Sequence, residues 1–124
     1  MSKLFILSGS ILAFFAVGFG AFGAHGLKSK ISAELMETFQ TGIQYQMYHA
    51  LGLILIGLIV QRLENALLLN WAGITILIGI LLFSGSLYIL SILGAGGFGI
   101  ITPFGGVCFL IGWLLLAFQV LKSM

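Results

Sequence analysis

The chain has 124 residues, of which 60% are hydrophobic and only 6% are charged, with a formal net charge of +2. Its mean hydropathy is +1.23. A soluble domain carries about 25% charged residues because its surface must be wetted. A chain so poor in charge cannot cover a water-soluble surface, so its solvent must be lipid. The few scattered charges also argue against a nucleic-acid-binding face and against a polybasic lipid-binding patch.

Four apolar stretches run along the chain, and each approaches or exceeds the ~20 residues that a helix needs to cross a bilayer. They cover residues 4–23, 43–60, 67–93 and 104–121, and every charged residue lies outside them. The alternating pattern of a barrel strand is absent, and backbone groups must pair internally in lipid. The sequence therefore predicts an all-α membrane protein, a four-transmembrane-helix bundle that forms one domain over residues 1–124.

The longest connection, residues 24–42, carries apolar residues at every fourth position and a plausible N-cap at Ser32. These apolar residues are Ile31, Leu35, Phe39 and Ile43. The pattern predicts a short amphipathic helix at the membrane interface between spans 1 and 2. A simple N-terminal extension of the second span fits equally well. Before the fourth span, Thr102 is expected as the N-cap and Pro103 as the first helical residue.

The basic residues outside the spans indicate an orientation. With four spans, Lys3, Arg62 and Lys122 share one side of the membrane, and Lys28 and Lys30 share the other. Basic residues are more frequent on the cytoplasmic side. We therefore expect both termini in the cytoplasm.

The first and third spans share a sequence pattern. Ser8-Gly9-Ser10 matches Ser84-Gly85-Ser86 at an offset of 76 residues, and the glycines that follow match at the same offset. Two repeated helical hairpins or coincidence in a glycine-rich chain would each explain this. Small residues also recur at four-residue spacing, at Ala16, Gly20 and Ala24 and at Cys108 and Gly112. Such faces let helices approach closely, and they lead us to expect self-association into a homo-oligomer.

Polar side chains gather in the membrane half opposite the termini, whereas the other half is nearly all aliphatic. The candidate ligand-binding residues are His25, Tyr45, Gln46, Tyr48, His49, Ser84, Ser86, Tyr88 and Thr102. They suit a pocket for a lipid headgroup, a quinone or a small polar solute. They also suit the hydrogen bonds that hold helices together in lipid. A metal or haem held by His25 and His49 is a third alternative, although two histidines without carboxylate or thiolate partners supply few ligands for a metal.

Four separated motifs resemble a known family over essentially the whole chain. They are Gly20-Ala21-Phe22-Gly23-Ala24-His25-Gly26-Leu27, Tyr45-Gln46-Met47-Tyr48-His49, Phe83-Ser84-Gly85-Ser86-Leu87-Tyr88 and Ile101-Thr102-Pro103 with Gly105-Gly106 and Gly112-Trp113. In these the chain resembles the YgdD/YwdK-type small bacterial membrane proteins of the domain-of-unknown-function 423 family, which is similar to eukaryotic transmembrane protein 256. The resemblance implies four helices in the cytoplasmic membrane and assigns no activity or role to any residue.

Two functional expectations follow. No Asp, Glu, Lys or Arg lies within a span, which argues against proton-coupled transport, and no catalytic triad can be assembled in the membrane. We therefore expect a component that is not an enzyme and has no cofactor or metal. It would bind membrane lipid or a small lipophilic molecule, or support envelope integrity. One alternative is an oligomeric channel or transporter with a Gln/Tyr/His/Ser-lined path. Another is an enzyme that acts on lipid at the interface with His25 or His49 as its base.

Overall fold

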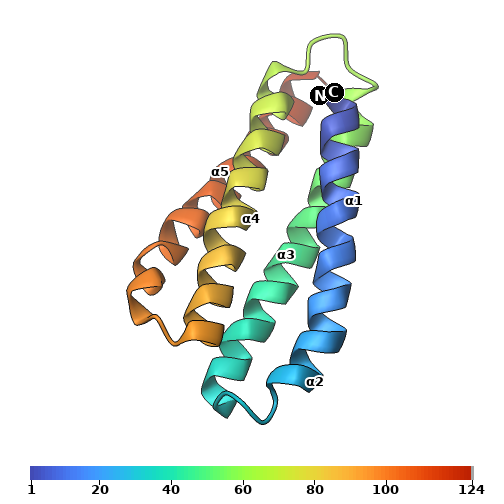
Figure 1. Cartoon of the computed structure of the whole chain (residues 1–124). Coiled ribbons are helices and arrows are strands. Elements are labelled where there is room, and N and C mark those ends of the chain that lie inside the picture. The colour runs from blue at the N-terminus through green and yellow to red at the C-terminus, as the bar shows by residue number, and fades with distance from the viewer. Residues whose placement is uncertain (124) are drawn as a thin grey trace.

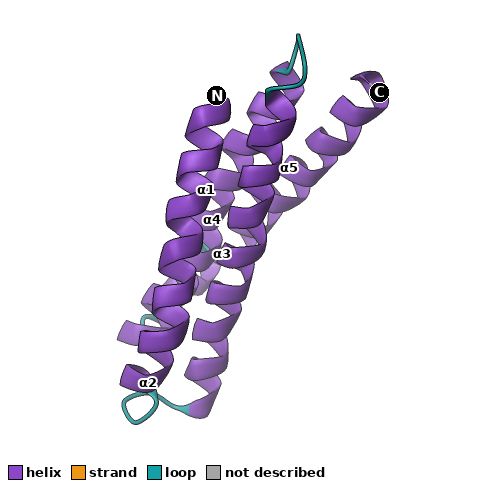
Figure 2. Cartoon of the chain, turned by 90° about the vertical axis from the view of Figure 1, so that its right-hand side faces the viewer, coloured by secondary structure: helices purple, strands orange, loops and turns teal. Residues whose placement is uncertain are grey.

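The computed structural model describes residues 1–123, apart from the side chain of Ala24, and consists of helices joined by short loops (Figure 2). The elements are α1 Ser2–Gly18, the π-helix η1 Phe19–Gly23, α2 Ala24–Leu27, α3 Ala33–Val60, α4 Leu67–Leu93, the 3₁₀-helix η2 Gly96–Ile100 and α5 Thr102–Ser123. In this part of the chain, four helical units are long and apolar enough to cross a membrane, and α1, η1 and α2 together form the first. Each is about 40 Å long, at ~1.5 Å per residue. The predicted all-α fold with four candidate spans is confirmed.

The four long units form a bundle in which chain neighbours are also packing neighbours (Figure 1). α1 packs on α3, α3 on α4, and α4 on α5. Both termini and the α3–α4 loop lie at one end, which we call the terminal end, and the α2–α3 and α4–α5 connections lie at the other, the loop end. The two ends of the chain therefore lie at the same end of the bundle, as four spans predict.

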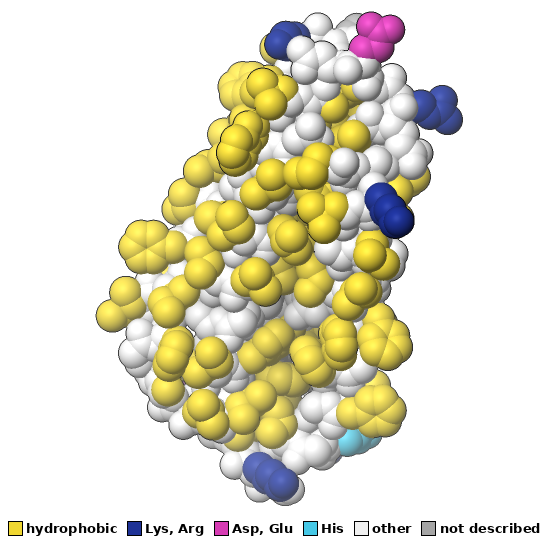
Figure 3. Space-filling view, turned by 45° about the horizontal axis from the view of Figure 1, so that its top comes forward, with side chains coloured by type: hydrophobic (Ala, Val, Ile, Leu, Met, Phe, Trp, Pro, Cys, Tyr) yellow, Lys and Arg dark blue, Asp and Glu magenta, His cyan; other side chains and the backbone are white. Residues whose placement is uncertain are grey.

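The outer surface of the bundle matches a lipid solvent. Figure 3 shows hydrophobic side chains over most of one face, with the charged groups toward its margins. Phe22 and Leu121 are each 80% exposed, near opposite ends of the bundle. Exposed apolar area of this extent in a soluble protein would mark a binding or aggregation surface. Such a surface is suited to contact with acyl chains.

The segment before the second span is helical, but it is not a separate helix. Ser32 caps α3 as predicted, because its Oγ accepts a hydrogen bond from the Leu35 N–H at 3.1 Å. From Ala33 the helix continues without a break to Val60. The predicted short amphipathic helix between spans 1 and 2 is therefore wrong, and the alternative, an N-terminal extension of the second span, is what forms. Residues 33–60 contain no proline that would interrupt the helix. Gly42, within the helix, packs against the ring of Tyr88.

The fourth span begins differently from the prediction. Gly94 ends α4 in the left-handed conformation with φ +67°, where glycine has no steric penalty. After η2, the backbone N–H groups of Phe104 and Gly105 donate to the Ile101 carbonyl, so Ile101 begins the turn and Thr102 is the first helical residue. Thr102 does not cap the helix. Its hydroxyl instead pairs with Ser86 of α4.

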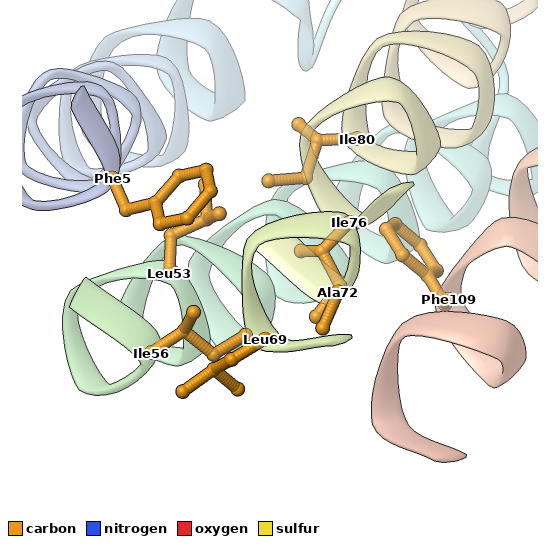
Figure 4. Close-up of a cluster of buried hydrophobic side chains, with 8 residues drawn as sticks. All are labelled: Phe5, Leu53, Ile56, Leu69, Ala72, Ile76, Ile80 and Phe109. Atoms are coloured by element: carbon orange, nitrogen blue, oxygen red, sulfur yellow. The ribbon is translucent and has the colours of Figure 1, made fainter. Parts of the chain in front are cut away.

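A hydrophobic core joins all four long helices (Figure 4). It consists of Phe5, Leu53, Ile56, Leu69, Ala72, Ile76, Ile80 and Phe109. Phe5 of α1 reaches α4, where its ring lies against Gly73 and leaves no room for a Cβ. In lipid this contact is driven by van der Waals packing rather than by exclusion of water.

Small residues bring the helix backbones together within the chain. A Cβ added at Gly9 would lie 2.6 Å from the Ala50 carbonyl oxygen, so α1 and α3 approach closely there. Gly112 packs against Ile76 of α4, and Ala16 is only 1% exposed. These small residues are thus used for packing inside the bundle. They therefore give no support to the expected contact between two copies of the chain. The side chain of Ala24 lies outside the part of the chain that the structure describes.

The two matching serine-glycine-serine segments have opposite environments. Gly9 is buried between helices, while the flanking Ser8 and Ser10 donate to carbonyls of their own helix. In the second copy the serines are buried, and Gly85 has no neighbour within 4 Å of an added Cβ. The matching sequence therefore does not correspond to a shared packing role, which counts against repeated hairpins.

Candidate functional site

A groove on the surface of the bundle has α1 with η1 and α2 as one wall, α4 as the other, and α3 as its floor. Two hollows adjoin there, with volumes of about 410 Å³ and about 260 Å³. Both are lined by Phe19 and Tyr88, so they form the two parts of one groove. Ligand pockets usually measure ~300–1,000 Å³ and are mostly apolar. We call this space the α1–α4 groove.

The larger hollow lies nearer the loop end. It is lined by Phe19, Gly23, Gly26, Leu27, Lys30, Phe39, Tyr88 and Ile92. Lys30 is the single charged residue among them, and it follows α2 at the end of the bundle. The remainder of this hollow is almost wholly apolar. The groove therefore has one cationic end and a long hydrocarbon-like interior.

The smaller hollow lies farther from the loop end, toward the middle of the bundle, and contains polar groups. Gln46 of α3 is 3% exposed; its amide nitrogen donates to the Leu12 carbonyl at 2.7 Å, and its Oε1 accepts from the Tyr88 hydroxyl at 2.5 Å. Ser84 donates to the Gly42 carbonyl at 2.6 Å. These bonds connect α1, α3 and α4 across the floor of the groove. The Tyr88 hydroxyl oxygen and the second Gln46 amide proton retain capacity for a further bond.

The π-helix η1 shapes the outer wall. A π-turn widens the helix locally, and such turns frequently mark functional sites. Phe19 begins η1 and Gly23 ends it, and both line the larger hollow. The Phe19 ring meets the Tyr88 ring edge to face at 5.6 Å between centroids, across the junction of the two hollows. The two rings thus lie where the two hollows adjoin.

His49 belongs to a different cluster, between α3 and α5. Its Nδ1 lies 2.7 Å from the Tyr45 carbonyl, and its Nε2 accepts from the Trp113 indole N–H at 3.0 Å. These partners require the neutral ring with its proton on Nδ1. The ring also stacks on Phe109, with centroids 3.6 Å apart. Because both nitrogens are engaged, His49 offers no lone pair to a metal and no free base. Trp113 is 38% exposed, and its ring lies against Gly52 of α3.

The structure divides the nine predicted site residues instead of gathering them into one pocket. Gln46, Ser84 and Tyr88 line the α1–α4 groove, whereas Tyr45 and His49 belong to the α3–α5 cluster. A third pair joins α4 to α5, where the hydroxyls of Ser86 and Thr102 lie 2.6 Å apart. The two remaining residues, His25 and Tyr48, are exposed on the outside of the bundle.

A further polar cluster, around Gln119 near the terminal end, was not predicted from the sequence. Gln119 is 2% exposed and accepts a hydrogen bond from the backbone N–H of Leu69. Its amide nitrogen donates to Ser123 and to the Asn65 carbonyl. The description of this membrane half as nearly all aliphatic was therefore incomplete. The signal available was a lone Gln in the last apolar run, a residue that is costly in lipid unless paired.

Fold and site together define a class: a small multi-pass membrane protein built from four candidate transmembrane helices, with a groove between α1 and α4. Comparisons narrow the class to a family. Residues 19–106 match the family model described as Protein of unknown function (DUF423). The chain is 47% identical over 120 residues to the UPF0382 membrane protein YwdK of Bacillus subtilis, covering 97% of this chain and 98% of that protein. The chain belongs to this DUF423 (UPF0382) family.

Relatives in other bacteria are equally similar. A UPF0382 membrane protein of Staphylococcus epidermidis is 49% identical over 120 residues, and one of Staphylococcus haemolyticus is 46% identical over the same length. Each alignment covers 97% of both chains. No solved structure matches the chain. The relatives are bacterial membrane proteins, and their names assign no activity.

Proposed function

We propose that the chain is a non-enzymatic membrane component that holds one lipid, or a similar lipophilic molecule, in the α1–α4 groove. The observation that carries the proposal is the pair of adjoining hollows joined at Phe19 and Tyr88. Their walls are apolar enough for an acyl chain. The buried Gln46–Tyr88 pair gives the inner part a hydrogen-bonding group, as in most pockets that orient an apolar ligand.

The charge at the loop end selects the kind of headgroup. Lys30 is exposed to the membrane surface and lines the mouth of the larger hollow. An ammonium group attracts the phosphate or carboxylate of an anionic headgroup by charge. The proposed occupant is therefore an anionic lipid whose chain enters the groove and whose headgroup stays beside Lys30.

The burial of the polar residues supports a pocket more than a pore. Gln46, Ser84 and Ser86 are each no more than 3% exposed and point into a single chain, whereas Tyr48 faces outward. Within the groove the lining residues include no nucleophile beside a free base, because His49 lies elsewhere with both nitrogens engaged. Both points support a binding role without turnover.

The proposed setting is the bacterial cytoplasmic membrane, with both termini on the cytoplasmic side. The excess of basic residues at the terminal end supports this orientation. The mouth of the groove would then open toward the opposite leaflet.

A photoreactive lipid tests the proposal. The probe is phosphatidylglycerol with a diazirine near the end of one acyl chain, in vesicles with the full-length protein. We expect labelling on α1 and α4 residues that line the groove, and several-fold less labelling in Gly85→Leu, whose side chain would fill the open space beside Ser84. Gly18→Leu is the matched control, because Gly18 also has no neighbour but lies outside the groove. Labelling spread evenly over the outer surface and unchanged in Gly85→Leu would remove the groove as a site.

A further inference from the structure

The outward face of α3 carries polar side chains that the bundle leaves uncovered. Gln40, Gln44 and Tyr48 lie one turn apart and are exposed, and Tyr48 is 57% exposed. Among the described residues, none of these three side chains makes a hydrogen bond. Gln46, which is 3% exposed, lies on the opposite side of the same helix. This face is therefore independent of the α1–α4 groove.

The level of these residues within the membrane makes their exposure costly. Gly42 of α3 lies beside Leu87 and Tyr88 of α4. Beyond that level α4 continues to Leu93, which is apolar and 74% exposed, about 8 Å farther toward the loop end at ~1.5 Å per residue. Gln44 and Tyr48 lie on the other side of Gly42, deeper in the hydrocarbon. Polar groups at such depth nearly always face protein or water.

The spacing of this face fits a helix pair. Gln44, Tyr48, Leu51, Leu55 and Leu58 follow one another at intervals of four, three, four and three residues. All five are exposed, with Leu51, Leu55 and Leu58 at 50%, 55% and 47%. This is the heptad seam of two helices packed knobs into holes. A polar residue within such a seam fixes the register of the two helices.

We infer that a second copy of this chain covers the outward face of α3, so that the protein is a two-fold symmetric dimer with Gln44 of each copy at the contact. A carboxamide both donates and accepts, so two Gln44 side chains related by a two-fold axis satisfy each other. The leucines extend the contact toward the terminal end, where only van der Waals packing is required. A partner of different sequence would need its own complementary amide, whereas a second copy supplies one at the matching position.

Cysteine cross-linking in native membranes tests this interface. The starting protein is Cys108→Ala, which removes the single cysteine. Gln44→Cys, Tyr48→Cys and Leu51→Cys are then oxidised and scored for covalent dimer. Phe14→Cys is the control, because it is 72% exposed on α1 and lies near the depth of Gln46, which bonds the Leu12 carbonyl. We expect dimer at the α3 positions and little at Phe14→Cys. Absence of dimer at α3, or equal dimer at Phe14→Cys, would overturn the inference.

A second measurement separates a specific contact from collision. The dimer fraction of the uncrosslinked protein is measured in vesicles by energy transfer between labelled copies at decreasing protein-to-lipid ratio. Gln44→Leu should weaken association about three- to ten-fold, since interhelical hydrogen bonds in lipid are each worth about a three-fold change on average. Unchanged association in Gln44→Leu, or assemblies of three or more copies in the original protein, would contradict the two-chain contact. Loss of the groove ligand would leave these outcomes unaffected.

Discussion

At the scale of single residues, the polar side chains of the spans form hydrogen bonds between helices, including one between α3 and α5, which are not consecutive in the chain. Gln46 bonds the Leu12 carbonyl of α1 and the Tyr88 hydroxyl of α4 at once. His49 is held between the Tyr45 carbonyl and the Trp113 indole. In lipid such bonds average ~0.6 kcal/mol and reach ~1.7 kcal/mol. Each buried polar residue is therefore a modest but specific determinant of which helices meet.

Removing the Tyr88 hydroxyl should weaken the bundle measurably. In Tyr88→Phe the Gln46 carbonyl oxygen loses its donor, so the free energy of unfolding should fall by about 0.6–1.7 kcal/mol. Thermal unfolding in mild detergent measures the change. Tyr45→Phe is the control, because the Tyr45 hydroxyl makes no hydrogen bond within the described residues and its ring packing on Phe83 is retained. Equal loss in both variants would contradict the assigned role of the Tyr88–Gln46 bond.

Lys30 should select the headgroup without determining occupancy. In Lys30→Gln the apolar lining is unchanged while the one charge at the mouth is removed. We expect co-purified lipid to shift from anionic toward zwitterionic classes, with the total amount nearly constant. Lipid extraction and mass analysis of the purified protein provide the measurement, and Lys28→Gln, outside the groove lining, is the control. A lipid composition identical in all three proteins would remove the headgroup assignment but leave the groove itself intact.

At the scale of secondary-structure elements, close backbone approach between α1 and α3 depends on Gly9. Gly9→Ala places a Cβ 2.6 Å from the Ala50 carbonyl oxygen and 2.8 Å from Ile54, so the helices must separate. Overpacking of this kind costs about 1–3 kcal/mol. Gly18→Ala has open space around it and should leave stability unchanged or slightly raised by helix propensity. Unfolding curves of the two variants that coincide would contradict the close approach at Gly9.

Element boundaries show where sequence reasoning works and where it does not. The apolar runs predicted four spans because length and hydropathy alone decide what crosses a bilayer. The Ser32 cap was predictable, since capping is local. Whether residues 33–42 form their own helix was not, because the helix periodicity continues unchanged into the second span. Thr102 was assigned to the cap from local preference, but its hydroxyl bonds Ser86, a contact between helices that no local pattern contains.

At the scale of the whole molecule, the candidate site was predictable only in part. Sequence placed the polar residues on one half of the bundle, and most of them lie there. It did not separate them among three interfaces, because the helix neighbours that receive each side chain depend on helix order and rotation. The α1–α4 groove arises because both helices pack on α3, while the ring contact where the hollows adjoin comes from Phe19 in a π-turn that no propensity predicts.

The orientation of the whole molecule gives a further prediction. Both termini lie at one end, which carries Lys3, Arg62 and Lys122. By the bias of basic residues toward the cytoplasm, a green fluorescent protein fused to the C-terminus should fluoresce, and alkaline phosphatase fused there should be inactive. A fusion in the α4–α5 connection should give the reverse. An active phosphatase at the C-terminus would place both termini outside the cytoplasm and contradict this orientation.

The claim that the α1–α4 groove holds a lipid is tested most directly by native mass spectrometry of the protein released from lipid nanodiscs. The account predicts a mass above a whole number of chains by one anionic lipid per chain. It predicts that the added mass persists in Gly18→Leu and is lost in Gly85→Leu, where the side chain fills the groove. A bare chain mass in the original protein, or the same lipid retained in Gly85→Leu, would contradict the claim.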